Sequence, residues 1–103
     1  MTGASLKEAG KGRWRLAGEL DFSSVPDVWP SLDRALRDRA AVNLSLDGVE
    51  RANSAGLVML LEALDVARER GCQLRLDAVP DELLDLARMS NCEALLAGNQ
   101  PRR

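Results

Sequence analysis

The sequence predicts an α/β domain built on a mixed sheet of four to five strands, with helices packed mainly on one face. Segments of alternating polar and apolar residues are separated by segments of helical periodicity, and strands that alternate with helices usually pair in parallel. The predicted strands are apolar on one face only, whereas a sheet covered on both faces has strands that are apolar throughout. We therefore expect helices on one face and water on the other.

The strands are predicted from this period-two alternation. In the segment RWRLAGEL, the side chains of Trp14, Leu16 and Leu20 share one face, while charged residues share the other. A short strand before it would pair with this segment through the turn AGKG, because Gly10 and Gly12 readily adopt positive φ angles. The predicted strands are residues 6–8, 13–20, 41–47 and 72–77.

The first helix is predicted within SSVPDVWPSLDRALRDR. Ser24 and Asp27 have the spacing of a capping box, and Pro26 suits a first helical turn. Pro30 leaves two alternatives, because proline lacks the amide hydrogen that a helix interior needs. Either the helix kinks at Pro30, or a short turn precedes a helix that begins near Trp29. The expected core stripe is Leu32, Ala35 and Leu36, extended by Trp29.

A second helix is predicted from about Ser54 to Arg70, with Gly71 as its C-terminal cap. At about 100° per residue, one apolar face would meet the core. Val58 and Met59 fall outside that face, toward the charged side, and Ser54, Val58 and Glu62 recur along one exposed stripe. The expected core residues are Leu57, Leu60, Leu61, Leu64 and Ala67. In a third helix, starting at Pro80, they are Leu83, Leu84, Ala87 and Met89.

Composition and charge exclude several classes of function. Apolar residues make up 46% of the chain and charged residues 29%, which is ordinary for a globular protein. The net charge is −2 and the basic residues are scattered among acidic ones, so nucleic-acid binding is not predicted. The segment MTGASLKEAGKGR lacks the apolar part of a signal peptide, and the sequence has no apolar run near the roughly 18 residues of a membrane span. We expect a cytoplasmic protein without direct membrane insertion, with one domain over residues 1–97 and a disordered tail over 98–103.

The chain contains no histidine, which excludes Ser-His-Asp and Cys-His catalysis within it and removes a preferred zinc ligand. Cys72 and Cys92 fit neither a CxxC motif nor a disulfide-rich scaffold, so we expect both to be packing residues. We predict no catalytic residue, no metal site and no cofactor. The protein is expected not to be an enzyme.

The segment ERANSAGLVMLLEAL raises a more specific question, because a single hydroxyl stands where the second helix begins. As a nucleophile, Ser54 would need a base, and the surrounding residues offer none. Either Asn53 or Ser54 could cap the helix by accepting a hydrogen bond from a first-turn amide. Ser54 could also be a phosphorylation or docking point, since Ala55 and Gly56 leave room for a partner to approach.

The order of elements, together with GELD at 18–21, VNLSLDGVERANSAGL at 42–57 and ARERGCQLRL at 67–76, resembles the STAS family of sulphate transporter and anti-sigma factor antagonist domains. The resemblance covers nearly the whole chain. It implies a mixed sheet with helices on one side, in agreement with the one-sided strands.

The resemblance also implies a role for the turn before the second helix. In anti-sigma factor antagonists this turn typically reads Asp-Ser-Ser-Gly, and a partner kinase phosphorylates the first serine. Here Asn53 replaces the aspartate, Ser54 keeps the phosphorylatable hydroxyl, Ala55 replaces the second serine and Gly56 is retained. One implied function is therefore an anti-sigma factor antagonist that binds an anti-sigma kinase and is switched by phosphorylation of Ser54.

A closer resemblance is to the stand-alone STAS subunits of phospholipid-trafficking ABC transporters, carried by LLEALDVARERG and VPDELLDLARMSNCEALL. It implies a small cytoplasmic subunit, peripheral to the inner membrane, that binds the transporter's ATPase and holds it in an active form. The apolar residues beside a small-residue helix start likewise indicate a protein-binding surface. The predicted partner-binding residues are Asn53, Ser54, Ala55, Gly56, Val58, Met59 and Glu62, joined by Asp21, Phe22 and Ser23.

Overall fold

The structure is a computed structural model, and it describes residues 3–97. The predicted tail, residues 98–103, lies outside the described residues. The elements in chain order are β1 (Ala4–Gly10), β2 (Arg13–Leu20), α1 (Val25–Ala35), β3 (Ala41–Ala52), α2 (Ser54–Glu69), β4 (Gln73–Asp77), α3 (Asp81–Met89) and α4 (Glu93–Ala97).

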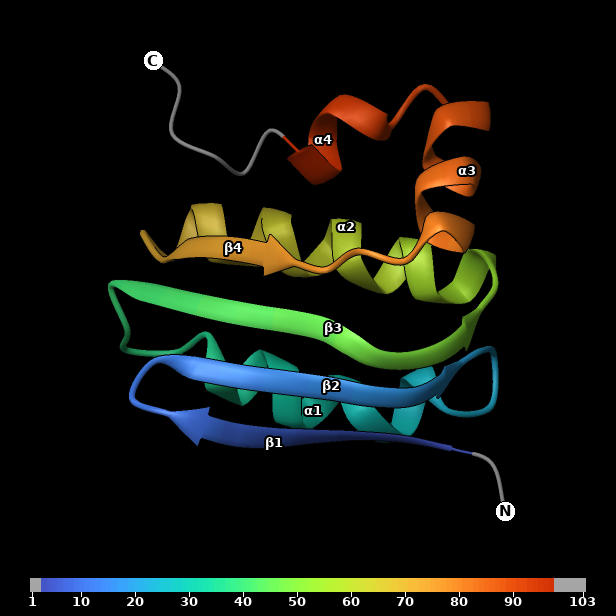
Figure 1. The fold of residues 1–103 in the computed structure, drawn as a ribbon. Coiled ribbons are helices and arrows are strands. Elements are labelled where there is room, and N and C mark those ends of the chain that lie inside the picture. The colour runs from blue at the N-terminus through green and yellow to red at the C-terminus, as the bar shows by residue number, and fades with distance from the viewer. Residues whose placement is uncertain (1–2, 98–103) are drawn as a thin grey trace.

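The four strands form one mixed sheet in the order β1-β2-β3-β4. β1 is antiparallel to β2, while β2, β3 and β4 are parallel to one another. The β1–β2 turn uses Gly10 at φ 136° and Gly12 at φ 72°, as predicted. Figure 1 shows α1 and α2 side by side behind the sheet, with α3 and α4 beyond β4. The predicted α/β fold, with its main helices on one face, is confirmed.

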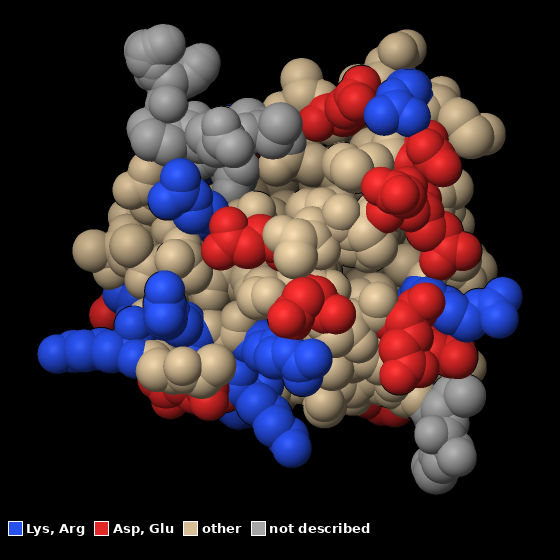
Figure 2. Space-filling view, viewed as in Figure 1, with Lys and Arg blue, Asp and Glu red and all other residues tan. Residues whose placement is uncertain are grey.

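Within residues 3–97, no helix covers the opposite face of the sheet (Figure 1). Arg15 of β2 lies between Lys7 of β1 and Ser45 of β3 in the strand register, and its guanidinium contacts Asp47 at 2.8 Å. Figure 2 shows acidic and basic side chains spread over this face. The alternating pattern therefore predicted the two faces of the sheet correctly: the buried apolar side chains of the strands face the helices, and the charged ones face water.

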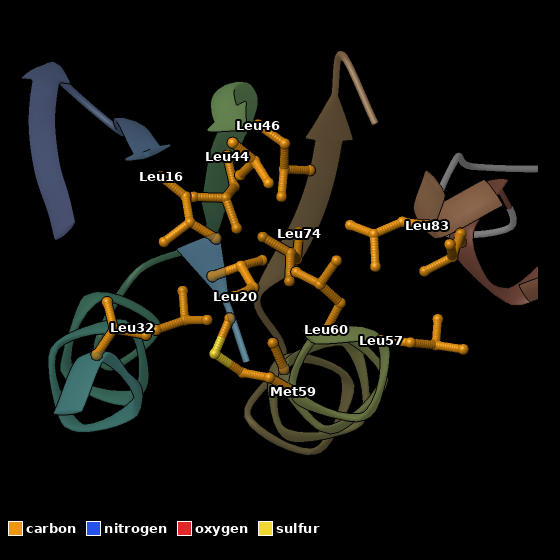
Figure 3. Close-up of a cluster of buried hydrophobic side chains, with 14 of the residues drawn as sticks. Leu16, Leu20, Leu32, Leu44, Leu46, Leu57, Met59, Leu60, Leu74 and Leu83 are labelled. Atoms are coloured by element: carbon orange, nitrogen blue, oxygen red, sulfur yellow. The ribbon is translucent and has the colours of Figure 1, made fainter. Parts of the chain in front are cut away.

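The core lies between the sheet and the helices (Figure 3). Fully burying a leucine side chain stabilises the fold by about 1.5–3 kcal/mol before conformational entropy is counted. The predicted stripe of α1 is confirmed, since Leu32, Ala35 and Leu36 are all buried. The largest side chains with less than 2% exposure are Leu16, Leu20, Leu32, Leu36, Leu44, Leu46, Leu60, Leu83 and Val42.

Helix α1 runs as one helix through Pro30, with Pro26 in its first turn, and does not begin near Trp29. The predicted capping box is wrong. Ser24 has helical backbone angles, and its hydroxyl makes no cap hydrogen bond. Instead this hydroxyl donates to the Glu19 carbonyl oxygen at 2.6 Å and accepts from the Asp21 amide at 3.0 Å. Ser24 is thus a buried residue within the turn between β2 and α1.

The predicted burial of two methionines, Met59 and Met89, is wrong. Met59 is only 3% exposed and belongs to the core, because α2 packs against both α1 and α3 and so buries a wider arc than one face. Met89 was expected in the core but is 81% exposed. It follows the buried Ala87 by two positions, about 200° around the helix, and therefore points away from the core.

Candidate docking surface between the first two helices

The candidate site forms where β2 and β3 end. These strands are parallel, so their carboxyl ends lie at the same edge of the sheet, where open α/β sheets commonly bind ligands. The Asn53 amide donates a hydrogen bond to the Leu20 carbonyl oxygen at 3.0 Å. This bond ties the start of α2 to the end of β2. The two predicted segments, 21–23 and 53–56, are therefore neighbours in space.

The turn after β2 is fixed by its own hydrogen bonds. The Asp21 carboxylate accepts from the amides of Ser23 and Ser24, each at 2.9 Å. The hydrogen bond from the Ser24 amide is the main reason that the pKa of Asp21 lies below its usual value. Between these residues Phe22 points outward and is 73% exposed. The turn therefore presents an aromatic ring to solvent.

Asn53 is the cap of α2. Its side-chain oxygen accepts a hydrogen bond from the Ala55 amide at 2.9 Å, and its backbone is extended, as a capping residue requires. An asparagine oxygen can accept this bond as an aspartate oxygen would. Ser54 is the first residue of the helix and is exposed. Asn53 therefore caps the helix, whereas Ser54 is the residue exposed to solvent.

Gly56 is a packing residue. It is buried, and a Cβ atom at this position would lie 2.9 Å from the Cβ of Leu20. Ala55 is also buried, with 8% exposure. The small residues at the start of α2 therefore let the helix approach β2 closely. The prediction that Gly56 contacts a partner has to be corrected on this point, because Gly56 is buried against the side chains of Leu20 and Ala52.

A largely apolar groove of about 510 Å³ separates the N-terminal halves of α1 and α2. We call it the docking groove. Its lining residues are Phe22, Val25, Pro26, Trp29, Ser54, Ala55, Val58, Met59 and Glu62. Phe22 and Val58, 73% and 63% exposed, are unusually open for large apolar side chains. Exposed apolar side chains beside a concave surface are typical of binding sites for proteins, membranes or small ligands.

The docking groove brings together six of the predicted residues: Phe22, Ser54, Ala55, Val58, Met59 and Glu62. Met59 contributes to its floor and does not stand on the outer face of α2. Asn53 and Asp21 act behind the groove by fixing its two turns. Sequence reasoning missed the wall formed by Val25, Pro26 and Trp29. The signal was the apolar spacing of Val25 and Trp29, but the pattern alone did not place α1 beside α2.

The chemical groups in the docking groove are few. Ser54 supplies one hydroxyl, and Glu62 supplies the only charged side chain of the lining. These residues are eight positions apart, about 12 Å along the helix axis, so the carboxylate cannot act as a base for the hydroxyl. Within residues 3–97, no group of three or more His, Cys, Asp or Glu side chains could hold a metal ion.

Neither cysteine lies in the docking groove. Cys72 is 4% exposed, and burial raises the pKa of its thiol, so it is protonated at neutral pH. Cys92 is half-buried, and its thiol donates to the Ser90 carbonyl oxygen at 3.3 Å. In the described part of the chain, no helix has both the length and the apolar character needed to cross a membrane.

Comparison with known proteins identifies the family. Residues 6–97 match the profile of the family described as Mlab, STAS domain. The chain belongs to the STAS domain family. Two relatives, from Escherichia coli (strain K12) and Shigella flexneri, are each named intermembrane phospholipid transport system binding protein MlaB. Each is 32% identical over 79 residues, which cover 77% of this STAS domain and 79% of the relative.

A solved structure supports the STAS fold independently. The crystal structure of an anti-sigma factor antagonist from Mycobacterium paratuberculosis matches 85% of this chain and 79% of its own length, with a TM-score of 0.61. The sequence identity is 19%, so this likeness concerns the fold. The predicted STAS-type sheet with helices on one side is therefore confirmed by both sequence and structure.

Proposed function

We propose that this STAS domain is a non-catalytic accessory subunit of an intermembrane phospholipid transport system. In this proposal it binds the cytoplasmic ATPase of an ABC transporter through the docking groove, and stabilises or activates that ATPase. The subunit is then cytoplasmic and peripheral to the inner membrane through its partner. The likeness to the two MlaB proteins supports the transport role.

One observation carries the docking role: Phe22 and Val58 are largely exposed beside the groove that begins at Ser54. Large apolar side chains that stay in water contribute nothing to folding, but burial against a partner would stabilise a complex by about 25 cal/mol for each Å² removed from water, before the costs of association. Aromatic residues are also enriched at the centres of protein interfaces. The groove offers a contact surface and no reaction machinery.

Co-purification tests the proposal. The tagged chain is expressed with the transporter's ATPase and permease, and the complex is purified from detergent-solubilised membranes. We expect the ATPase to co-purify with wild type and to be lost with Val58→Asp, Phe22→Asp or Ser54→Arg. Met89→Asp is the matched control, because it adds the same charge at an exposed apolar residue outside the groove. Absence of the ATPase from the wild-type sample, or its full retention by Ser54→Arg, would refute the proposal.

A second candidate is an anti-sigma factor antagonist switched by phosphorylation of Ser54. It is favoured by the exposure of Ser54 in the first turn of α2, where amides and the helix dipole stabilise a phosphate. A phosphate there would place negative charge in the docking groove and so alter binding. Incubation with the partner kinase should add the mass of one phosphate to wild type and none to Ser54→Ala. Equal phosphorylation of both proteins would exclude Ser54 as the switch.

A further inference from the structure

We infer that the docking groove binds an amphipathic helix of the ATPase, with an apolar side chain held between Phe22 and Val58 and a Lys or Arg paired with Glu62. The inference rests on the proposed function, which names the groove but not the form or charge of what enters it. It concerns the secondary structure of the partner segment and one charge contact.

The walls of the docking groove exclude strand addition. They are formed by α1, α2 and the turn before α1, and the backbone groups within a helix are bonded to one another. The open edges of the sheet belong to β1 and β4, and neither strand lines the groove. An extended peptide would bury amides and carbonyls without partners, which costs free energy. A helix satisfies its own backbone and needs only side-chain contacts.

The arrangement of α1 and α2 suits a third helix. The two helices lie side by side on the same face of the sheet (Figure 1). The groove between their N-terminal halves is apolar at Val25, Trp29 and Val58. Helices pack by setting the side-chain ridge of one into the groove of another. An apolar ridge of the partner would cover Phe22 and Val58, the two large apolar side chains of the lining that are largely exposed.

The negative charge of Glu62 favours a positively charged side chain on the partner. Glu62 is the only charged residue of the lining, and it makes no salt bridge within residues 3–97. Asp27 on α1 and Glu69 on α2 also make no salt bridge in these residues, but neither lines the groove, so Glu62 is the carboxylate that a partner in the groove would meet. A partner that covered Glu62 with apolar groups would leave a desolvated carboxylate without a partner. A Lys or Arg beside the apolar ridge removes that cost and gives the contact its specificity.

Charge substitutions on α2 test the electrostatic part. The affinity of the intact chain for the ATPase is measured at low and high salt for wild type, Glu62→Gln, Glu62→Lys and Glu69→Lys. Glu69→Lys is the matched control, since Glu69 is exposed on the same helix and outside the groove. We expect Glu62→Lys to weaken binding by about tenfold or more at low salt, Glu62→Gln to weaken it less and reduce its salt dependence, and Glu69→Lys to behave as wild type.

The outcomes separate this inference from the proposed function. If Val58→Asp abolishes binding while Glu62→Lys binds as wild type does, the groove is the docking site but the charge contact is wrong. If neither substitution weakens binding, both proposals fail. Hydrogen exchange of the ATPase with and without this chain tests the helix. Protection of a helical segment that carries a Lys or Arg beside apolar residues supports the inference, and protection confined to a strand or loop overturns it.

Discussion

Arg70, directly after the end of α2, donates two hydrogen bonds to Asp33 of α1, from Nη2 to the carboxylate at 2.7 Å and from Nη1 to the backbone carbonyl oxygen at 2.9 Å. This pair joins the two helices beyond the docking groove, which lies between their N-terminal halves. The hydrogen bond from Arg70 is the main reason that the pKa of Asp33 lies below its ordinary value of 3.8. The contact between α1 and α2 at this end therefore depends on the ionised carboxylate of Asp33.

Replacing this carboxylate should change stability in a pH-dependent way. Because the pKa of Asp33 is lowered in the folded state, its stabilisation is complete above the ordinary value of 3.8 and is lost as pH falls below it. At about pH 7, Asp33→Asn should lower the free energy of unfolding by about 0.2–1 kcal/mol, the range measured for exposed ion pairs. At about pH 2.5 the difference from wild type should be smaller than at pH 7.

Urea unfolding followed by circular dichroism at both pH values measures the effect. Glu50→Gln serves as the control, because Glu50 is exposed on β3 and makes no salt bridge in the described residues. A destabilisation by Asp33→Asn that is equally large at low pH would contradict the ionic origin of the effect.

The packing of Gly56 against Leu20 predicts that adding a single methyl group, in Gly56→Ala, destabilises the fold. Alanine is a better helix former than glycine by about 1 kcal/mol, so Gly56→Ala would stabilise an open helix. Here the new Cβ would lie 2.9 Å from the Leu20 Cβ, and we expect a net loss of about 1–3 kcal/mol in unfolding free energy. Gly3→Ala, where nothing lies within 4 Å, should change stability little. A Gly56→Ala protein as stable as wild type would show that α2 does not approach β2 this closely.

The cap of α2 can be assigned by substitution. Asn53→Ala removes the acceptor of the Ala55 amide and should cost about 1 kcal/mol of stability, while Asn53→Asp should keep the cap. Ser54→Ala should change stability by less than about 0.5 kcal/mol, because Asn53 supplies the cap. Thermal unfolding of the three variants compares them directly. Greater destabilisation by Ser54→Ala than by Asn53→Ala would reverse the assignment.

The two methionines form a matched pair. Met59→Ala should destabilise the protein by about 2–5 kcal/mol, because this side chain is buried in the core (Figure 3). Met89→Ala removes the same atoms from a side chain that is 81% exposed, and should cost less than about 0.5 kcal/mol. Chemical denaturation measures both. Similar values for the two variants would mean that Met59 is not part of the core.

The strands were predicted correctly where polar and apolar residues alternate along their whole length. Residues 13–20 form β2 with the predicted bounds, but β3 continues to Ala52, beyond the predicted residue 47. In β3 the buried face passes from Leu46 to Val49, three positions apart, where the register with β2 shifts. Such an irregularity breaks the alternation that identifies a strand. The second half of β3 was therefore hidden from a period-two search.

Helical periodicity predicted the α2 side of the site, whereas on the α1 side only Phe22 was among the predicted residues. Ser54, Val58 and Glu62 share a stripe of one helix, and local periodicity is enough to group them. Met59 could not be assigned in this way, because its burial depends on the helices on both sides of α2. Trp29 packs against the core as expected, but it is only partly buried and also lines the docking groove. That placement depends on tertiary packing between α1 and α2.

The turn that holds Phe22 has a kinetic consequence. The Asp21 carboxylate and the Ser24 hydroxyl fix the turn before any partner arrives, so the backbone around the aromatic ring is already ordered. Little conformational entropy remains to be lost at this position when a complex forms. In the proposed complex, loosening the turn with Asp21→Ala would then slow productive encounters, although the Phe22 ring itself is retained.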